Sequence, residues 1–286
     1  DDGGYGDPGS TADVMLAIGA NRIDGSDWTT PNGASILDYW SQDNAAAYAA
    51  QSPAAAAKLL LAVKAAGADP AAFAGLDLPA VVNGNYDAAT GAYGFSNWDQ
   101  ALSMLAVAAG DDLVPSAAAD LLAARANPDG SWGFMSPRDA GDTNSTALAL
   151  QAIRAAGACR RAPVVEDAVA YLKQAQNDDG GFNYTTDDQS DANSTAFAIQ
   201  GLIAADREPA GAYWGKDDIT PVDFLLSLQI GDGADADSFA YQTGGASNAL
   251  ATQQAVPALL RTPFVDEDDL ATCYETYLPL VRGSVQ

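Results

Sequence analysis

The chain has 286 residues, 48% of them hydrophobic, and a formal net charge of −25 with no histidine. This charge repels nucleic acids and anionic membranes. No apolar run reaches the length of about 18 residues that a membrane span needs. The lack of histidine excludes Ser-His and Cys-His catalysis and histidine-bound metals. Solubility, calcium-binding loops and adaptation to high salt are three open explanations of the acidity.

Six Ala-rich helices follow one another along the chain, each after a glycine-aromatic turn. The first follows the sequence D-D-G-G-Y; the second opens with Ser52 and Pro53, a typical N-cap and first-turn pair, and should end near Gly67. Pro257 should kink or shorten the last one. The expected ranges are 10–20, 53–66, 97–109, 144–156, 193–205 and 247–261.

The fourth and fifth of these units are close copies. Trp132 and Phe182 each follow an Asp-Gly turn and lie 50 residues apart. Asn144 and Asn193, each in an Asp-x-Asn-Ser-Thr segment, lie 49 residues apart. Glycine permits the turn, and the aromatic ring should fill the gap between neighbouring repeats. This stapling role is expected of Trp132, Phe182, Tyr93 and Tyr5, and the self-similarity indicates a repeat architecture.

Five shorter amphipathic helices lie between the Ala-rich ones, and a sixth, over residues 267–281, should complete the first repeat. Alanine lets helices approach closely, which suits an inner ring, whereas polar-faced helices such as 165–176 suit an outer, half-wet ring. Strand signals are nearly absent. We therefore predict an all-α, closed α6/α6 toroid, one domain over residues 1–286 with six inner and six outer helices. The alternative, an open solenoid, would need polar capping repeats.

The turns from Gln176 to Phe182 and from Asp129 to Trp132 resemble the QW-type repeats of squalene and hopene cyclases. Essentially the whole chain resembles the terpenoid-cyclase/prenyltransferase superfamily of α/α toroids, with two units that match closely and four that match loosely. The toroid domain of cobalamin carriers is similar too.

The residues present decide which activities of that superfamily fit. Protein prenyltransferases hold zinc with Asp, Cys and His, and this chain has no His. Complement-like thioester domains need Cys-Gly-Glu-Gln, which begins at neither Cys159 nor Cys273. Class II terpene cyclases protonate an alkene with the middle Asp of D-x-D-D-T-A, but Asn144 and Asn193 stand in that frame, and an amide is no strong acid. Those cyclases also generally place their site between two toroid-like domains, and one is present here.

We interpret the two Asp-x-Asn-Ser-Thr segments mainly as helix caps, whose polar side chains satisfy free backbone N–H groups at the positive helix end. Because the inner-helix starts converge on one end of the toroid, they also mark a barrel mouth. The ligand-binding candidates there are Asn97, Trp98, Asp99, Asp142, Asn144, Ser145, Asp191, Asn193 and Ser194. No catalytic residue is predicted.

Two loops concentrate carboxylates at a spacing that resembles calcium loops, although neither contains the glutamate of a full EF-hand pattern. A solvated acidic loop is the favoured interpretation, and calcium is the one cofactor considered. The metal-ligand candidates are Asp187, Asp188, Asp191, Asp232, Asp235 and Asp237.

The two cysteines, Cys159 and Cys273, should lie on opposite sides of a six-unit ring. A disulfide needs Cα atoms within about 7 Å, so two free thiols are expected.

These features lead to the expectation of a non-catalytic binding or structural module of a secreted or cell-surface protein. A class II terpene-cyclase-like enzyme with an atypical acid and the toroid half of a cobalamin-type carrier are the alternatives. An apolar, aromatic-lined central cavity would favour the cyclase, and a shallow polar funnel the carrier or binding module. The expected partners are an unidentified ligand or protein, or other domains of a longer chain, with no nucleic acid.

Overall fold

A computed structural model describes residues 2–135, 137, 139–185 and 188–264 of the chain. Over these residues it contains eleven α-helices and two short 3-10 helices, Pro70–Ala72 and Ala212–Trp214. Within the same residues the extended pairings are isolated bridges, which fits the near absence of strand signals in the sequence.

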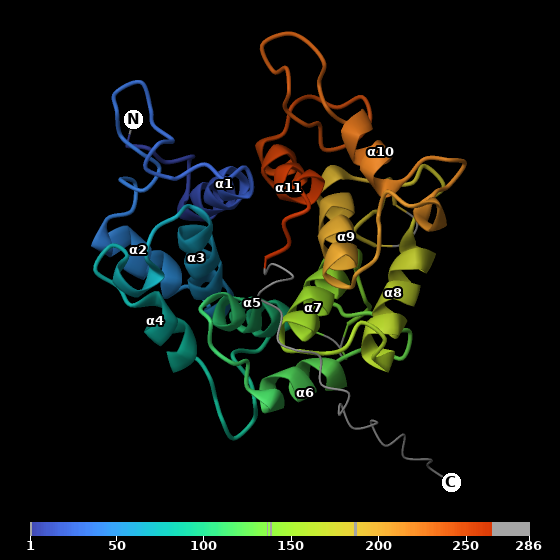
Figure 1. Cartoon of the computed structure of the whole chain (residues 1–286), viewed down its shortest axis with the longest axis horizontal. Coiled ribbons are helices and arrows are strands. Elements are labelled where there is room, and N and C mark those ends of the chain that lie inside the picture. The colour runs from blue at the N-terminus through green and yellow to red at the C-terminus, as the bar shows by residue number, and fades with distance from the viewer. Residues whose placement is uncertain (1, 136, 138, 186–187, 265–286) are drawn as a thin grey trace.

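The inner helices stand side by side and close into a ring (Figure 1). Each contacts the next around the ring, and the last, α11, contacts the first, α1, so that the inner ring has no open edge. The inner helices are α1 (Pro8–Ala20), α3 (Pro53–Ala65), α5 (Asn97–Ala109), α7 (Thr143–Ala155), α9 (Ala192–Ala204) and α11 (Ala249–Leu259).

Five further helices lie outside the ring, each in the connection between two successive inner helices (Figure 1). They are α2 (Gln42–Ala49), α4 (Leu78–Gly84), α6 (Ser116–Ala124), α8 (Pro163–Ala175) and α10 (Pro221–Ser227). The predicted all-α toroid is confirmed. The helix expected over residues 267–281, which would make the outer set six, lies outside the described residues.

Side-chain caps explain why the inner helices begin where they do. The residue before each one accepts a hydrogen bond from the backbone N–H three positions on, which satisfies a donor that would otherwise have no partner. These caps are Asp7, Ser52, Ser96, Asp142, Asp191 and Asn248. The predicted starts lie within two residues of the observed ones. Helix α11 has 11 residues where α9 has 13, in line with the expected effect of Pro257.

Small residues allow the inner helices to pack closely. A Cβ atom added to Gly201 of α9 would lie 2.9 Å from the Cα atom of Ala147 in α7, and one added to Gly19 of α1 would lie 2.3 Å from the carbonyl oxygen of Ala65 in α3. Distances this short leave no room for a side chain, so the Ala- and Gly-rich composition sets the diameter of the ring.

The aromatic residues of the glycine-aromatic turns fill the space between repeats, with one exception. Trp132 and Phe182 are fully buried, and Tyr93 is nearly so. The Trp132 indole N–H also donates to the Leu122 carbonyl at 2.8 Å. Tyr5 is 44% exposed, so its expected stapling role is wrong. Its hydroxyl instead accepts from the indole N–H of Trp28 at 2.6 Å.

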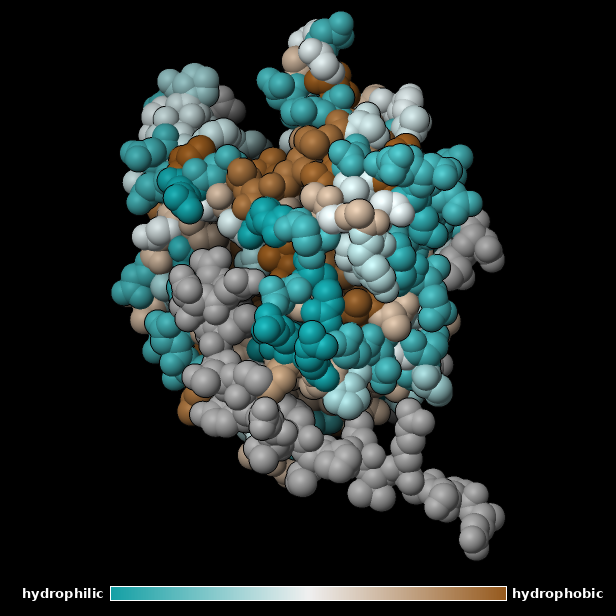
Figure 2. All heavy atoms as spheres, turned by 45° about the vertical axis from the view of Figure 1, so that its right-hand side comes forward, coloured by the Kyte–Doolittle hydropathy of each residue, from teal (hydrophilic) through white to brown (hydrophobic). Residues whose placement is uncertain are grey.

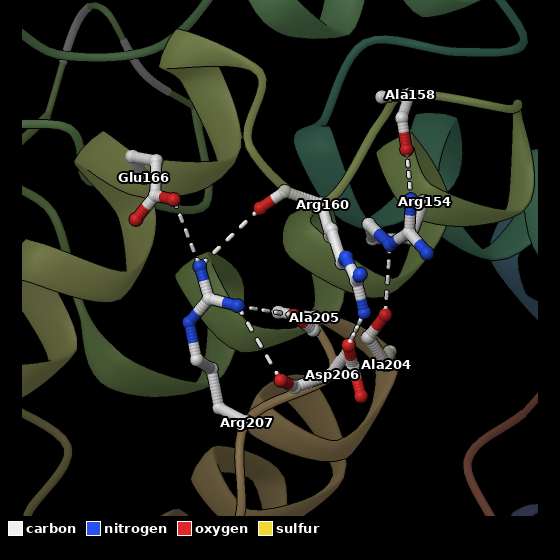
Figure 3. Close-up of polar contacts among 8 residues, drawn as sticks. All are labelled: Arg154, Ala158, Arg160, Glu166, Ala204, Ala205, Asp206 and Arg207. Atoms are coloured by element: carbon white, nitrogen blue, oxygen red, sulfur yellow. Dashed lines mark hydrogen bonds and ion pairs between the residues drawn. The ribbon is translucent and has the colours of Figure 1, made fainter. Parts of the chain in front are cut away.

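Cationic side chains join successive inner helices at their C-terminal ends (Figure 3). Arg154, the twelfth residue of α7, donates through Nε to the carbonyl of Ala204, the last residue of α9, at 2.9 Å. Lys64, at the same position in α3, donates to the carbonyl of Ala109, the last residue of α5. Positive charge at a helix C-terminus is stabilising because it satisfies free carbonyls and opposes the helix dipole.

Cys159 is disulfide-bonded, so the expectation of two free thiols is wrong; Cys273 itself lies outside the described residues. That expectation assumed that the chain leaves α11 toward the first repeat. Instead, the backbone N–H of Phe264 donates to the Gln151 side-chain oxygen at 3.2 Å, which brings the chain after α11 to α7, the helix just before Cys159.

The face in Figure 2 is largely hydrophilic, with hydrophobic residues gathered toward its upper middle. Over the described part of the chain, no helix combines the length and apolar character needed to cross a bilayer.

Candidate functional site

A cavity of about 340 Å³ lies inside the ring of inner helices. Its size is within the range of about 300–1,000 Å³ that small-molecule pockets occupy. All six inner helices contribute to its wall, and Thr262, Pro263 and Phe264, which follow α11, contribute as well.

One position recurs on every inner helix: its sixth residue lines the cavity. Because each helix starts at its capping residue, the sixth residue of each has the same place around its helix axis. In ring order these residues, which we call the belt, are Asp13, Lys58, Leu102, Leu148, Phe197 and Gln254. The belt has a charged side on α1 and α3 and an apolar side on α5, α7 and α9.

The apolar side of the belt is completed by an aromatic pair. Trp98, at the start of α5, packs edge-on against Phe197 of α9 with 5.5 Å between ring centroids. The Trp98 indole N–H donates to the hydroxyl of Ser145 on α7 at 2.8 Å, which holds the ring between the two helices. The wall opposite the charged side thus presents two aromatic rings and two leucines.

The charged side holds an ion pair. Lys58 Nζ lies 2.6 Å from Asp13 Oδ1, and the two side chains are 23% and 14% exposed. Lys64 also lines the cavity. Among the described residues, the charged groups of the lining are two lysines and one aspartate, so the lining carries a net positive charge within a chain of −25. Such a lining attracts an anionic group and would oppose a cationic one.

Burial raises the pKa of the Asp13 carboxyl, because removal from water disfavours the charged form. The Lys58 ammonium opposes this shift through its charge and its hydrogen bond, and the Asp7 carboxylate adds to it. Desolvation is the larger effect, so the pKa of the Asp13 carboxyl stays above its usual value despite the contact with Lys58.

The predicted acidic candidates serve as helix caps. Asp142 and Asp191 each accept from the backbone N–H of a serine three residues on, and Asp99 completes a capping box with Ser96. Burial raises the pKa of both Asp142 and Asp191, while the serine hydrogen bonds oppose the rise. None of the three lines the cavity.

Most of the polar candidates make hydrogen bonds within the protein, and two of the asparagines have a buried oxygen without a partner. Asn97 donates to the Gly133 carbonyl at 2.8 Å, and the Ser194 hydroxyl donates to its own cap, Asp191. Asn193, 7% exposed, donates through Nδ2 to the Gln254 side chain at 2.6 Å, whereas its Oδ1 is buried with no hydrogen-bond partner. The Asn144 Oδ1 is likewise buried without a partner. None of these side chains lines the cavity, although Asn193 contacts the belt residue Gln254.

Of the predicted ligand-binding residues, Trp98 alone lines the cavity. Sequence reasoning missed Asp13 and Lys58, which lie one and a half turns into their helices. Aligning the six inner helices at their capping residues and reading down the sixth column would have found them. The sequence motif marks the starts of the inner helices, whereas most of the cavity-lining residues lie further along each helix.

The acidic loops gain no support as a calcium site. Over the part of the chain that the structure describes, no group of three or more His, Cys, Asp or Glu residues is placed to hold a metal ion. Both carboxylate oxygens of Asp191 accept from Ser194, and Asp187 lies outside the described residues. The calcium prediction rests on the sequence alone.

No family model matches the chain. By sequence it is similar to two drimenyl diphosphate synthases: 34% identical over 97 residues to that of Streptantibioticus cattleyicolor and 38% identical over 85 residues to that of Streptomyces showdoensis. These segments make up 34% and 29% of this chain but only 18% and 16% of the relatives.

The fold is similar to solved α/α toroids. The type II terpene cyclase MstE from Scytonema matches with a TM-score of 0.56 and 16% identity, over 88% of this chain and 86% of that one. The ent-copalyl diphosphate synthase of Streptomyces platensis matches with a TM-score of 0.55 and 17% identity, over 88% of this chain and 50% of that one. Protein geranylgeranyltransferase-I of Candida albicans matches with a TM-score of 0.59 and 11% identity, over 90% and 84% of the two chains.

The resemblance to the terpenoid-cyclase/prenyltransferase toroids is therefore confirmed, and the expected function is corrected. A non-catalytic binding or structural module was expected because the acid frame contains Asn144 and Asn193. The relatives found by sequence are enzymes, and class II terpene cyclases share the fold, which contradicts that expectation.

Proposed function

We propose that this chain is a class II terpene-cyclase-like enzyme that protonates and cyclises a linear isoprenoid in its central cavity. The observation that carries the proposal is the belt, where an aromatic-lined apolar wall and a carboxyl group face the same cavity. This is the kind of lining that distinguishes the cyclase from the shallow polar funnel of a carrier.

Each side of the belt suits one demand of the reaction. A cyclising isoprenoid passes through carbocations, which aromatic faces stabilise by about 0.5–2 kcal/mol each and which water would quench. Trp98 and Phe197 supply such faces beside Leu102 and Leu148. Lys64, in the last turn of α3 and away from the Asp13–Lys58 pair, suits an anionic head group, such as a diphosphate or a carboxylate.

The likenesses support the reaction class and leave the substrate a proposal. The two relatives are named for drimenyl diphosphate, and a structure of an MstE variant contains geranylgeranyl dihydroxybenzoate as substrate. The match covers 88% of this chain and 86% of the MstE chain, so the two chains are close in length. This weakens the objection that such cyclases need two toroid-like domains. Secretion or surface location stays a prediction.

The test is turnover of linear isoprenoids. The purified chain is incubated with farnesyl diphosphate, geranylgeranyl diphosphate and geranylgeranyl dihydroxybenzoate, and the products are identified by mass spectrometry. Protonation-initiated cyclisation should give cyclic isomers that keep the head group, with no inorganic pyrophosphate released. Release of pyrophosphate, or tight binding without any conversion, would contradict the proposal; the second result would favour a carrier.

A cavity-filling variant locates the reaction. Leu148→Trp adds bulk to a belt residue that is 1% exposed, so turnover should fall at least tenfold, while Leu226→Trp, on a residue of α10 that is 47% exposed, serves as the control. Overpacking costs typically about 1–3 kcal/mol of stability, so both variants are first checked for an intact thermal transition. Equal turnover in the two variants would place the reaction elsewhere.

A further inference from the structure

The frame in which class II cyclases carry their acid contains amides in this chain, so the proton must come from another group. A candidate acid has to line the cavity, and Asp13 is the one carboxyl group among the described lining residues. Asp142 and Asp191 lie at the helix starts, where each caps its own helix.

The position of Asp13 in the belt suits proton transfer to an apolar substrate. In a ring of six helices, α1 lies across the axis from α7, so that Asp13 is on the opposite side of the belt from Leu148. An isoprenoid chain held against the apolar side would therefore present its π face to the Asp13 carboxyl. The side chain is 14% exposed and lines the cavity.

The groups packed around Asp13 leave it with a single close cation. Lys58 faces it from α3, and Gln254 is its uncharged belt neighbour on α11. The Asp7 carboxylate acts on Asp13 from the start of α1. On α2, burial and, to a smaller extent, the charge of Asp13 raise the pKa of the Tyr48 hydroxyl. Lys58 is therefore placed to stabilise the carboxylate that remains once a proton has left.

We propose that Asp13 is the catalytic acid of the cyclisation and that Lys58 is its positioning residue. This inference rests on the proposed function. The protonated Asp13 carboxyl gives its proton to one carbon of the terminal alkene, whose π electron pair forms the new C–H bond and leaves a tertiary carbocation. Internal alkenes then attack in turn to form the rings. The final carbocation loses a proton to water, and Asp13 is reprotonated from solvent, so product and substrate are isomers.

The first experiment removes the acid and keeps its shape. Asp13→Asn should reduce turnover of farnesyl diphosphate by at least about 100-fold, the usual scale for the loss of a general acid, with little change in the affinity for that ligand by calorimetry. Asp120→Asn, an exposed residue of the outer helix α6, makes the same change of charge and should keep wild-type turnover. Wild-type turnover in Asp13→Asn would overturn this assignment alone, whereas a wild type that converts none of the substrates would overturn the proposed function and the assignment with it.

The pH profile tests Lys58. The reaction needs protonated Asp13, so the rate should fall as pH rises through the Asp13 pKa. Lys58 lowers that pKa, so Lys58→Met should move the falling limb to higher pH and slow the plateau rate, while Lys58→Arg should restore most of the wild-type profile. A limb that stays in place in Lys58→Met would exclude the positioning role.

A readout independent of turnover uses a saturated analogue of farnesyl diphosphate, which has no alkene to protonate. The infrared difference between the wild type and Asp13→Asn, each with the analogue bound, should show a protonated carboxyl stretch at mildly acidic pH that is absent from the variant. Only a carboxylate stretch at that pH would count against Asp13 as the acid.

Discussion

Threonine at the fourth position of α7 and α9 has a role that the capping interpretation did not assign. Thr195 Oγ1 accepts from the backbone N–H of Phe182 at 2.9 Å, and Thr146 does the same for Trp132 at 3.0 Å. The N-cap is the aspartate, the serine supplies the backbone donor, and the threonine ties the aromatic turn to the helix. The same contact recurs between Thr252 and Phe239.

Replacing Thr195 by valine should therefore destabilise the fold. Thr195→Val keeps the shape but leaves the buried Phe182 N–H without its partner, at a cost of about 1–3 kcal/mol in the free energy of unfolding. Urea denaturation measures it, with Thr243→Val on an exposed loop as the control, expected within about 0.5 kcal/mol of the wild type. Equal midpoints for the two variants would show that the turn does not depend on this bond.

At the scale of the helices, the closeness of α7 and α9 depends on Gly201. Inside a helix, alanine is more favourable than glycine by about 1 kcal/mol. A methyl group at position 201, however, would lie 2.9 Å from Ala147, and overpacking of this kind costs about 1–3 kcal/mol. Gly201→Ala should therefore lower the free energy of unfolding by about 1 kcal/mol.

Gly84, the last residue of α4, is the matched comparison. A Cβ atom there would meet nothing within 4 Å, so Gly84→Ala should be neutral or stabilising by about 0.5–1 kcal/mol. The two substitutions are chemically identical, and the expected opposite signs report the packing alone. A stabilised Gly201→Ala variant would mean that the inner ring can widen without cost.

The helices also show which boundaries local chemistry controls. All six inner helices have a side-chain N-cap, and their starts were predicted within two residues. The outer helices α6 and α8 begin after Pro115 and Ala162 without a side-chain cap hydrogen bond, although α8 has a proline, Pro163, at its first position. The expected helix over 165–176 accordingly begins two residues earlier, at Pro163, and ends one earlier.

At the scale of the whole molecule, buried carboxyls should make stability depend on pH. Burial raises the pKa values of Asp142 and Asp191 in the folded state, so the stability they contribute is greatest at low pH and is lost as pH rises through those folded values. Lowering the pH also reduces the self-repulsion of a chain at −25. The thermal midpoint should therefore rise as pH falls from neutral into the mildly acidic range.

Further acidification should reverse the gain. The pKa values of Asp7 and Asp223 are lowered by their hydrogen bonds with Ser10 and Thr220, so their contribution is lost as pH falls through the lowered values. Asp142→Asn keeps a capping side chain and should flatten the rising part of the curve more than Asp120→Asn, which makes the same charge change on the surface. Identical curves for these two variants would leave general charge repulsion as the sole cause.

The sequence by itself determined the class of fold, the number and starts of the inner helices, and the family of toroids that the chain resembles. These follow from local chemistry, because caps, glycine turns and alanine content act within a few residues. The tertiary structure decided which residues line the central cavity. Asp13, Lys58, Phe197 and Gln254 come together only because six helices start in register and close into a ring, and that closure depends on contacts between residues as far apart in the chain as α1 and α11.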